Sequence, residues 1–284
     1  MTIQANLGGA PATSPSLAAT IARVDELTHF DVHLGPPASG EWVGSDQLLV
    51  SATDRLPDLV ARARDWWDTE DLRIAASLLV YTYAQRLAVV ALAAFALERR
   101  VPDVSAGNVA IELPADRPIG GIALREPRFA CLGDEAQAAE GVFNLADDEQ
   151  LLAWLQERLL GAHLERFVQA LRREVPVSPT ILWGNVAACC AGAFVRVLQF
   201  RGSPPATFEQ DARACFDTLI TPLDRRAGYA RLQHEDREWL MFRRGTCCLS
   251  YRRAGSPYCA DCVHLDEATI EAAWRKKVSP PAPP

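Results

Sequence analysis

The chain has 284 residues, 49% of them hydrophobic and 23% charged, and a net charge of −7. These values predict a globular protein with a sizeable core, in one large or two modest domains. The acidic balance argues against a general nucleic-acid binder or a binder of anionic membranes.

The N-terminal part of the chain predicts helices around one short strand. Ser14 or Ser16 can cap a first helix that runs to about Leu27. We expect a strand at 30–35, followed by a helix over 46–67 that is kinked near Pro57.

The longest apolar tract lies in the next predicted helix, over residues 71–100. Gln85 and Arg86 interrupt this tract near its middle. A charged Arg is costly at bilayer depth, so we expect a buried core helix and no stable membrane span. The start of the chain also lacks the basic and apolar regions of a secretory signal peptide, and we therefore expect a cytoplasmic protein.

The pattern changes after residue 102. Three short apolar runs, "NVAIEL", "IGGIAL" and "RFACLG", predict an antiparallel meander. Beyond them the spacing predicts further helices and then strands in "REWLMFRR" and "CCLSYRR", with a turn at "AGSP". The predicted helices cover residues 147–173, 179–200, 207–220 and 266–277.

The predicted fold is a helix-rich α+β protein with a small antiparallel sheet and a C-terminal cysteine hairpin. Residues 1–12 and 278–284 are rich in Pro and small residues and are expected to be disordered. The segment "EVPVSP" near Pro176 is the expected boundary between an N-terminal subdomain at 13–175 and a C-terminal subdomain at 176–277.

Four of the eight cysteines lie in one C-terminal stretch, "RRGTCCLSYRRAGSPYCADCVH" at 243–264. A hairpin turning at "AGSP" would bring Cys247 and Cys248 beside Cys259 and Cys262. Adjacent cysteines form a disulfide poorly, and their side chains would point to opposite faces of a strand. We therefore expect a bend at Cys247–Cys248, which Gly245 would permit.

Clustered thiols in a reducing compartment indicate metal or redox chemistry. Four thiolates suit zinc or an iron–sulfur cluster. Structural zinc sites usually have two C-x₂₋₄-C pairs, whereas this stretch has only one. The spacing therefore favours a cluster and leaves zinc open.

Basic residues surround the cysteines. Residues 237–264 contain five Arg and two acidic residues, a local net charge of +3 in a protein of net charge −7. Nearby cations would hold an anionic cluster and raise its potential. The candidates for contacts to the cluster or substrate are Arg243, Arg244, Arg252 and Arg253; the alternative is a solvated face.

The spacing C-C-x₁₀-C-x₂-C near the C-terminus, with "CCLSYR" and "YCADC", resembles the FhuF family of siderophore-iron reductases. The upstream "LWGN" at 182–185 is similar to a shorter pattern of that family. The resemblance implies a [2Fe–2S] cluster on Cys247, Cys248, Cys259 and Cys262 in a FhuF-like C-terminal subdomain. It also implies one-electron reduction of a ferric siderophore in the cytoplasm.

The other cysteine and motif residues have simpler interpretations. Cys131, Cys189, Cys190 and Cys215 are expected in the core. His264 is expected in the second coordination layer or at the surface, and "CADC" lacks the setting of a thioredoxin-like pair. Trp183 and Asn185 of "LWGN" either pack internally or form a surface against the cysteine segment or the siderophore.

Two other functions stay open from the sequence. One is a zinc-stapled protein with structural or binding duties, and the other is a [2Fe–2S] electron carrier without a siderophore pocket. The chain has no G-x-G-x-x-G motif after a strand, so we expect an external electron donor. The siderophore type is not specified by the sequence.

Overall fold

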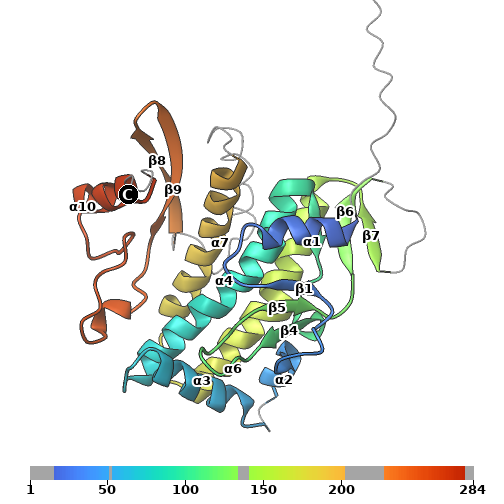
Figure 1. Ribbon diagram of the computed structural model, residues 1–284, viewed down its shortest axis with the longest axis horizontal. Coiled ribbons are helices and arrows are strands. Elements are labelled where there is room, and N and C mark those ends of the chain that lie inside the picture. Colours follow the sequence, from blue (N-terminus) through green and yellow to red (C-terminus); the bar gives the residue numbers. More distant parts are fainter. Residues whose placement is uncertain (1–15, 51–52, 134–140, 202–226, 279–284) are drawn as a thin grey trace, which may run out of the picture.

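The computed structural model describes residues 16–50, 53–133, 141–201 and 227–278. In these ranges two long helices, α4 and α7, pack side by side through the centre of the molecule (Figure 1). The α-helices are α1 (Leu17–Asp25), α2 (Ser45–Leu48), α3 (Arg55–Trp66), α4 (Leu72–Glu98), α5 (Asp148–Gln156), α6 (Arg166–Glu174), α7 (Pro179–Arg201) and α10 (Glu267–Val278). A π-helix, η2 (Glu157–Glu165), joins α5 to α6, and short 3₁₀ turns form η1 (Ala106–Asn108) and η3 (Ser250–Arg252).

The strands form three small sheets. One has the order β1-β5-β4-β2, the second β3-β6-β7, and the third is the hairpin β8-β9. Their bounds are β1 (Val32–Leu34), β2 (Trp42–Gly44), β3 (Arg100–Pro102), β4 (Val109–Glu112), β5 (Ile122–Leu124), β6 (Phe129–Leu132), β7 (Val142–Leu145), β8 (Ala227–His234) and β9 (Arg237–Arg244).

Local signals place several helices as predicted. The Ser16 side chain accepts a hydrogen bond from the Ala19 amide and starts α1. Asp71 caps α4 through the Arg73 amide, and Asp266 accepts from the Thr269 amide at the start of α10. The helix-rich α+β class is therefore confirmed. The predicted helix over 207–220, Cys215 and the segments at 1–12 and 278–284 that were expected to be disordered lie outside the described residues, except that Val278 ends α10.

Three predicted elements differ from the structure. The helix expected over 46–67 is two helices, and Pro57 lies in the first turn of α3 rather than at the break, because a Pro in a first turn sacrifices no helical hydrogen bond. The expected meander forms only in part: β4 and β5 pair antiparallel, but β6 lies in the second sheet, where it pairs antiparallel with β3 and parallel with β7. The segment "CCLSYRR" contains the 3₁₀ turn η3 and no strand.

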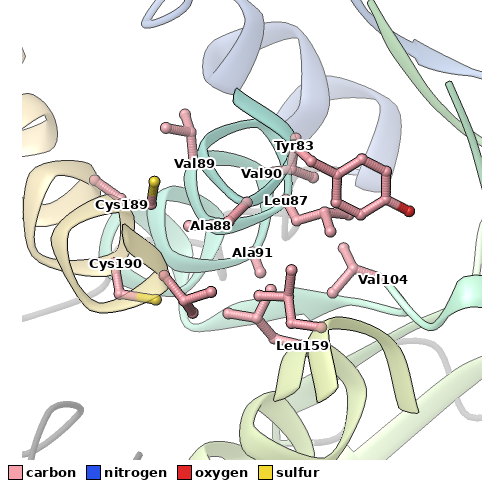
Figure 2. Packing of buried hydrophobic residues seen from close by; sticks show 14 of the residues in the cluster. Tyr83, Leu87, Ala88, Val89, Val90, Ala91, Val104, Leu159, Cys189 and Cys190 are labelled. Atoms are coloured by element: carbon pink, nitrogen blue, oxygen red, sulfur yellow. The ribbon is translucent and has the colours of Figure 1, made fainter. Parts of the chain in front are cut away.

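The main core is built on α4 and α7. Small residues such as Ala88 and Ala91 of α4 and Cys190 of α7 are buried and let the two helices approach closely (Figure 2). Cys131 and Cys189 are buried as well, so the expectation of core packing for these three cysteines is confirmed. The core contains residues from both sides of Pro176, and the division at that residue stays a prediction.

Helices α4 and α7 are long and apolar enough to cross a membrane by length and composition alone. In their most apolar windows, 83% of the α4 residues and 78% of the α7 residues are buried inside the protein. Arg86 of α4 is buried too, and its guanidinium donates to the carbonyl oxygens of Thr82, Ile119 and Gly120. These contacts fit a core helix, and the absence of a membrane span stays a prediction.

A buried histidine links the π-helix to α4. His163 is completely buried; its Nδ1 donates to the Val104 carbonyl oxygen at 2.5 Å, and its Nε2 accepts from the Tyr83 hydroxyl at 2.6 Å. Burial lowers the pKa of His163 to about 4. The folded protein therefore holds His163 neutral at pH 7, and the sequence offers no pattern from which this role could be read.

This histidine predicts an acid-dependent loss of stability. The pKa of His163 is lower in the folded state than the roughly 6.5 of an unfolded chain, so the unfolded state binds the proton first as the pH falls. The contribution of neutral His163 to the free energy of unfolding is complete above about pH 6.5. It decreases as the pH falls towards 4, by about 2 kcal/mol between pH 7 and pH 5. Urea unfolding at several pH values measures this pH dependence of the free energy of unfolding. The variant His163→Gln should lose this part of the pH dependence, and an unchanged slope would contradict the assignment.

Candidate functional site: the cysteine segment

The cysteine segment, defined as residues 245–264, follows β9 directly and lies at the edge of the molecule beside the lower end of α4 (Figure 1). Its backbone bends at Gly245 and Thr246, before the cysteine pair, and again at Leu249, which has a φ of +66°, so the bend expected at Cys247–Cys248 lies on either side of that pair. This left-handed residue ends the extended backbone after the cysteine pair, so the expected strand cannot form there. Gly255, with a φ of +69°, forms the predicted "AGSP" turn.

The four thiols lie in two buried and two half-buried positions. Cys248 and Cys262 are 5% and 4% exposed, whereas Cys247 and Cys259 are half-buried. The Sγ atoms of Cys248 and Cys259 are 3.4 Å apart, and the Cys247 Sγ accepts a hydrogen bond from the Leu249 amide at 3.2 Å. The predicted approach of the first pair to the second is thus present for Cys248 and Cys259.

The contact between the Cys248 and Cys259 thiols shifts their pKa values in opposite directions. A hydrogen bond from the Cys259 thiol lowers the pKa of Cys248 to about 6, and the same contact raises the pKa of Cys259. Burial raises the pKa of Cys247. In the core, burial raises the pKa of Cys190 to about 12 and also raises that of Cys189, which keeps both as neutral thiols.

The chemistry of the donor set fits a two-iron cluster. In the described part of the chain, no group of three or more His, Cys, Asp or Glu side chains is placed to hold one metal ion. A [2Fe–2S] cluster takes four thiolates spread over two irons. The Thr246 hydroxyl, next to Cys247, is buried without a hydrogen-bond partner and lies against Gly184 of α7.

A chain of hydrogen bonds seats the segment on α4 and α7. The Ser77 hydroxyl of α4 donates to the Cys248 carbonyl oxygen at 2.7 Å. The Asn185 Nδ2 of α7 donates to the Ser77 backbone and hydroxyl oxygens at 2.8 and 2.9 Å. The Asn185 Oδ1 accepts from the Arg244 Nη1 at 3.0 Å. Every link is buried, so the position of Cys248 depends on both helices.

Arg244 extends this network to the second cysteine pair. Its Nε donates to the Asp261 Oδ2 at 2.9 Å, and Asp261 lies between Cys259 and Cys262. Its guanidinium also lies over the Tyr81 ring, 4.8 Å from the centroid. Burial alone would lower the pKa of Arg244, but the negative charge of the Asp261 carboxylate is the main cause that raises it overall. The side chain is therefore a permanent buried cation beside the cysteines.

The other three predicted arginines are less buried than Arg244. Arg243 and Arg252 are exposed, Arg253 is half-buried, and Arg243 pairs with Glu267 of α10 at 3.4 Å. His264 is exposed and contacts the rings of Tyr251 and Tyr258, with ring centroids 5.0 and 6.0 Å away. Of the four predicted arginines, Arg244 has the contacts that join both cysteine pairs.

The "LWGN" residues divide between the core and the cysteine segment. Trp183 is buried in the main core. A Cβ atom on Gly184 would lie 1.5 Å from the Thr246 hydroxyl oxygen, so only glycine allows α7 to approach this segment. Asn185 reaches the segment through Ser77 and Arg244. Ser77, Thr246 and Asp261 were not among the predicted site residues, because nothing local distinguishes them from other polar residues.

Two family models match the chain, one over the helical part and one over the cysteine segment. A family model described as "Ferric iron reductase FhuF-like transporter" matches residues 77–238, and "FhuF 2Fe-2S C-terminal domain" matches residues 244–264. No curated protein matches the chain.

Solved structures of aerobactin synthetase IucA from a hypervirulent pathotype of Klebsiella pneumoniae resemble part of the chain. The ATP-bound structure has 23% identity and a TM-score of 0.40, over 48% of this chain and 25% of the synthetase. A second IucA structure has 21% identity and a TM-score of 0.37, over 50% and 26% of the two chains. The matched region is thus about a quarter of the synthetase, and no property of that enzyme is carried over.

The first family model spans more than half of the 284 residues, and the second contains the four clustered cysteines. The second model also identifies the cofactor as a [2Fe–2S] cluster. By these matches the chain belongs to the FhuF family, the ferric iron reductases with a C-terminal [2Fe–2S] domain.

Proposed function

We propose that this protein is a cytoplasmic ferric-siderophore reductase whose cluster is held by Cys247, Cys248, Cys259 and Cys262. The observation that carries the proposal is the position of the segment matched by the 2Fe-2S family model. That segment lies at the edge of the molecule, with half-buried thiols, and a buried polar network ties it to the part matched by the reductase model.

The chemistry needs one electron and no proton. A siderophore holds Fe(III) with hard oxygen ligands, and Fe(II) binds such ligands far less tightly, so reduction releases the iron. When bound, a [2Fe–2S] cluster supplies electrons one at a time. The balance is one electron taken up by the ferric complex, giving Fe(II) and the free siderophore; an external donor then returns the electron to the protein.

The residues of the chain hold and shield the centre. Ser77 and Asn185 fix the backbone of Cys248, and Arg244 binds Asp261 in the loop of the second pair. The positive charge of Arg244 stabilises added negative charge nearby, which favours the reduced state. The burial of Cys248 and Cys262 excludes water from half of the ligand set.

Spectroscopy and iron release test this function together. Anaerobically purified protein should be brown, with about two irons per chain and an EPR signal after reduction with dithionite. The reduced protein should transfer its electron to a ferric siderophore with saturation, which is followed by a colour-forming Fe(II) chelator. A colourless protein that holds zinc after attempted reconstitution would favour the zinc-stapled alternative. A cluster protein that no ferric siderophore saturates would favour the electron carrier.

Cysteine-to-serine variants at a clustered position and at a core position form a matched comparison. Cys248→Ser should abolish the visible spectrum and iron release, because a serine hydroxyl is a poor replacement for a thiolate on iron. Cys190→Ser makes the same sulfur-to-oxygen change in the main core, outside the four clustered cysteines, and should keep the cluster even if it lowers stability. The iron content per chain tests whether Cys248 is a ligand of the cluster. If Cys248→Ser retains the wild-type iron content, Cys248 is not a ligand.

A further inference from the structure

A cavity of about 400 Å³ lies next to the cysteine segment. Its walls come from α4, α7, β9, α10 and the loop residues Ala260 and Asp261. The volume is within the roughly 300–1,000 Å³ of small-molecule sites. Because Ala260 and Asp261 are the two residues between Cys259 and Cys262, a molecule in this cavity would touch the loop that carries the second cysteine pair.

The charged residues of the cavity wall are mainly cationic. Arg196 and Lys277 line it, together with one carboxylate, Asp261. The Asp261 charge is already paired with Arg244. Arg196 donates to the neutral Leu27 carbonyl oxygen and so keeps its full charge, and no described carboxylate lies within ion-pair distance of Lys277. The cavity therefore offers an excess of positive charge to a ligand.

Neutral groups complete the cavity. Burial raises the pKa of Tyr81, so its phenol stays protonated and uncharged. Gln85 and Gln199 add amide donors and acceptors, while Val89 and Trp274 supply apolar surface. The Tyr81 ring also lies under the Arg244 guanidinium. The cavity wall is therefore in contact with the hydrogen-bond network that holds both cysteine pairs.

We propose that this cavity binds an anionic ferric chelate and presents it to the Cys259–Cys262 loop, an inference that rests on the proposed reductase function. The chemical class follows from the charge. Three catecholates, or carboxylates combined with other groups, leave a ferric complex with surplus negative charge, whereas three hydroxamates only neutralise the metal ion. Positive side chains beside an anionic cluster also offset its repulsion of an anionic substrate.

Gallium(III) complexes separate binding from reduction, because Ga(III) accepts no electron under these conditions. Cluster-loaded protein is dialysed to equilibrium against the Ga(III) complex of a tricatecholate and, separately, of a trihydroxamate, and bound gallium is measured by elemental analysis. We expect the anionic complex to bind at least about tenfold more tightly, a difference of about 1.4 kcal/mol, and to weaken with added salt.

Two wall variants locate the binding. Lys277→Glu and Gln199→Glu should each weaken binding of the anionic complex by about tenfold or more, since each adds repulsion at the wall. Lys276→Glu makes the same charge change one residue earlier, at an exposed position that is not part of the wall, and should change binding by less than about twofold.

The outcomes distinguish this inference from the proposed function. If Lys277→Glu and Gln199→Glu bind like Lys276→Glu, or if the trihydroxamate complex binds as well as the tricatecholate, the cavity inference fails even when ferric siderophore is reduced. If the anionic gallium complex binds and the wall variants lose it, the cavity inference holds, even when the loaded protein reduces no ferric complex and the reductase function fails.

Discussion

Arg244→Gln is expected to lower the free energy of unfolding by about 3–5 kcal/mol, the usual effect of breaking a buried ion pair from one side. The variant leaves the Asp261 carboxylate, whose side chain is only 14% exposed, beside two cysteines without its cation, and it removes a donor from Asn185. In cluster-loaded protein it should also shift the reduction potential to more negative values, because the reduced state carries more negative charge. Urea unfolding and a potentiometric EPR titration measure the two effects.

Arg243→Gln is the matched control for this change. Arg243 precedes Arg244 in the same strand, but it is exposed and pairs with Glu267 at the surface. Exposed pairs contribute about 0–1 kcal/mol, so this variant should have nearly wild-type stability and potential. Adding Asp261→Asn to Arg244→Gln should restore part of the lost stability, because the buried charge is removed. Equal effects of the two arginine variants would contradict the role assigned to Arg244.

Gly184→Ala is expected to reduce cluster occupancy and to destabilise the protein by about 1–3 kcal/mol, the range for forcing extra volume into a packed site. The added Cβ would lie 1.5 Å from the Thr246 Oγ1 and 2.6 Å from the Thr246 Cβ. Either α7 or the backbone before Cys247 must move. Iron content after identical reconstitution and thermal unfolding of the apoprotein measure the two effects.

Gly228→Ala provides the comparison, because a Cβ on Gly228 in β8 meets no atom within 4 Å. It should bind iron like the wild type. The double variant Gly184→Ala with Thr246→Gly removes the clashing side chain and should recover cluster occupancy. If Gly184→Ala binds the full complement of iron, the close approach of α7 is not required for the site.

Local sequence signals determined much of the helical framework. The capping candidate Ser16 and the long apolar tract after Asp71 correctly predicted α1 and α4. A helix is formed by hydrogen bonds between residues four apart, so its signals lie close together in the chain. The cysteine spacing is equally local. With its flanking residues it resembles the FhuF family, and this resemblance implied the cofactor, which the family match confirms.

The tertiary structure decided the arrangement around the cysteines. Ser77 contacts Cys248 across 171 positions, and Asn185 contacts Ser77 across 108. No pattern in either neighbourhood reports such pairs, because they depend on how α4 and α7 pack. The same holds for the parallel pairing of β6 with β7 and for the bend at Leu249, which replaced the predicted strand.

The sequence by itself determined where the two long helices α4 and α7 form, which thiols cluster and to which family the chain belongs. Only the tertiary structure decided that Arg244, of four similar arginines, is buried between the two cysteine pairs, and that a cationic cavity opens beside them. The physical reason is distance along the chain. Capping and spacing act within a few residues, whereas burial, charge pairing and cavity shape arise where segments more than a hundred residues apart come into contact.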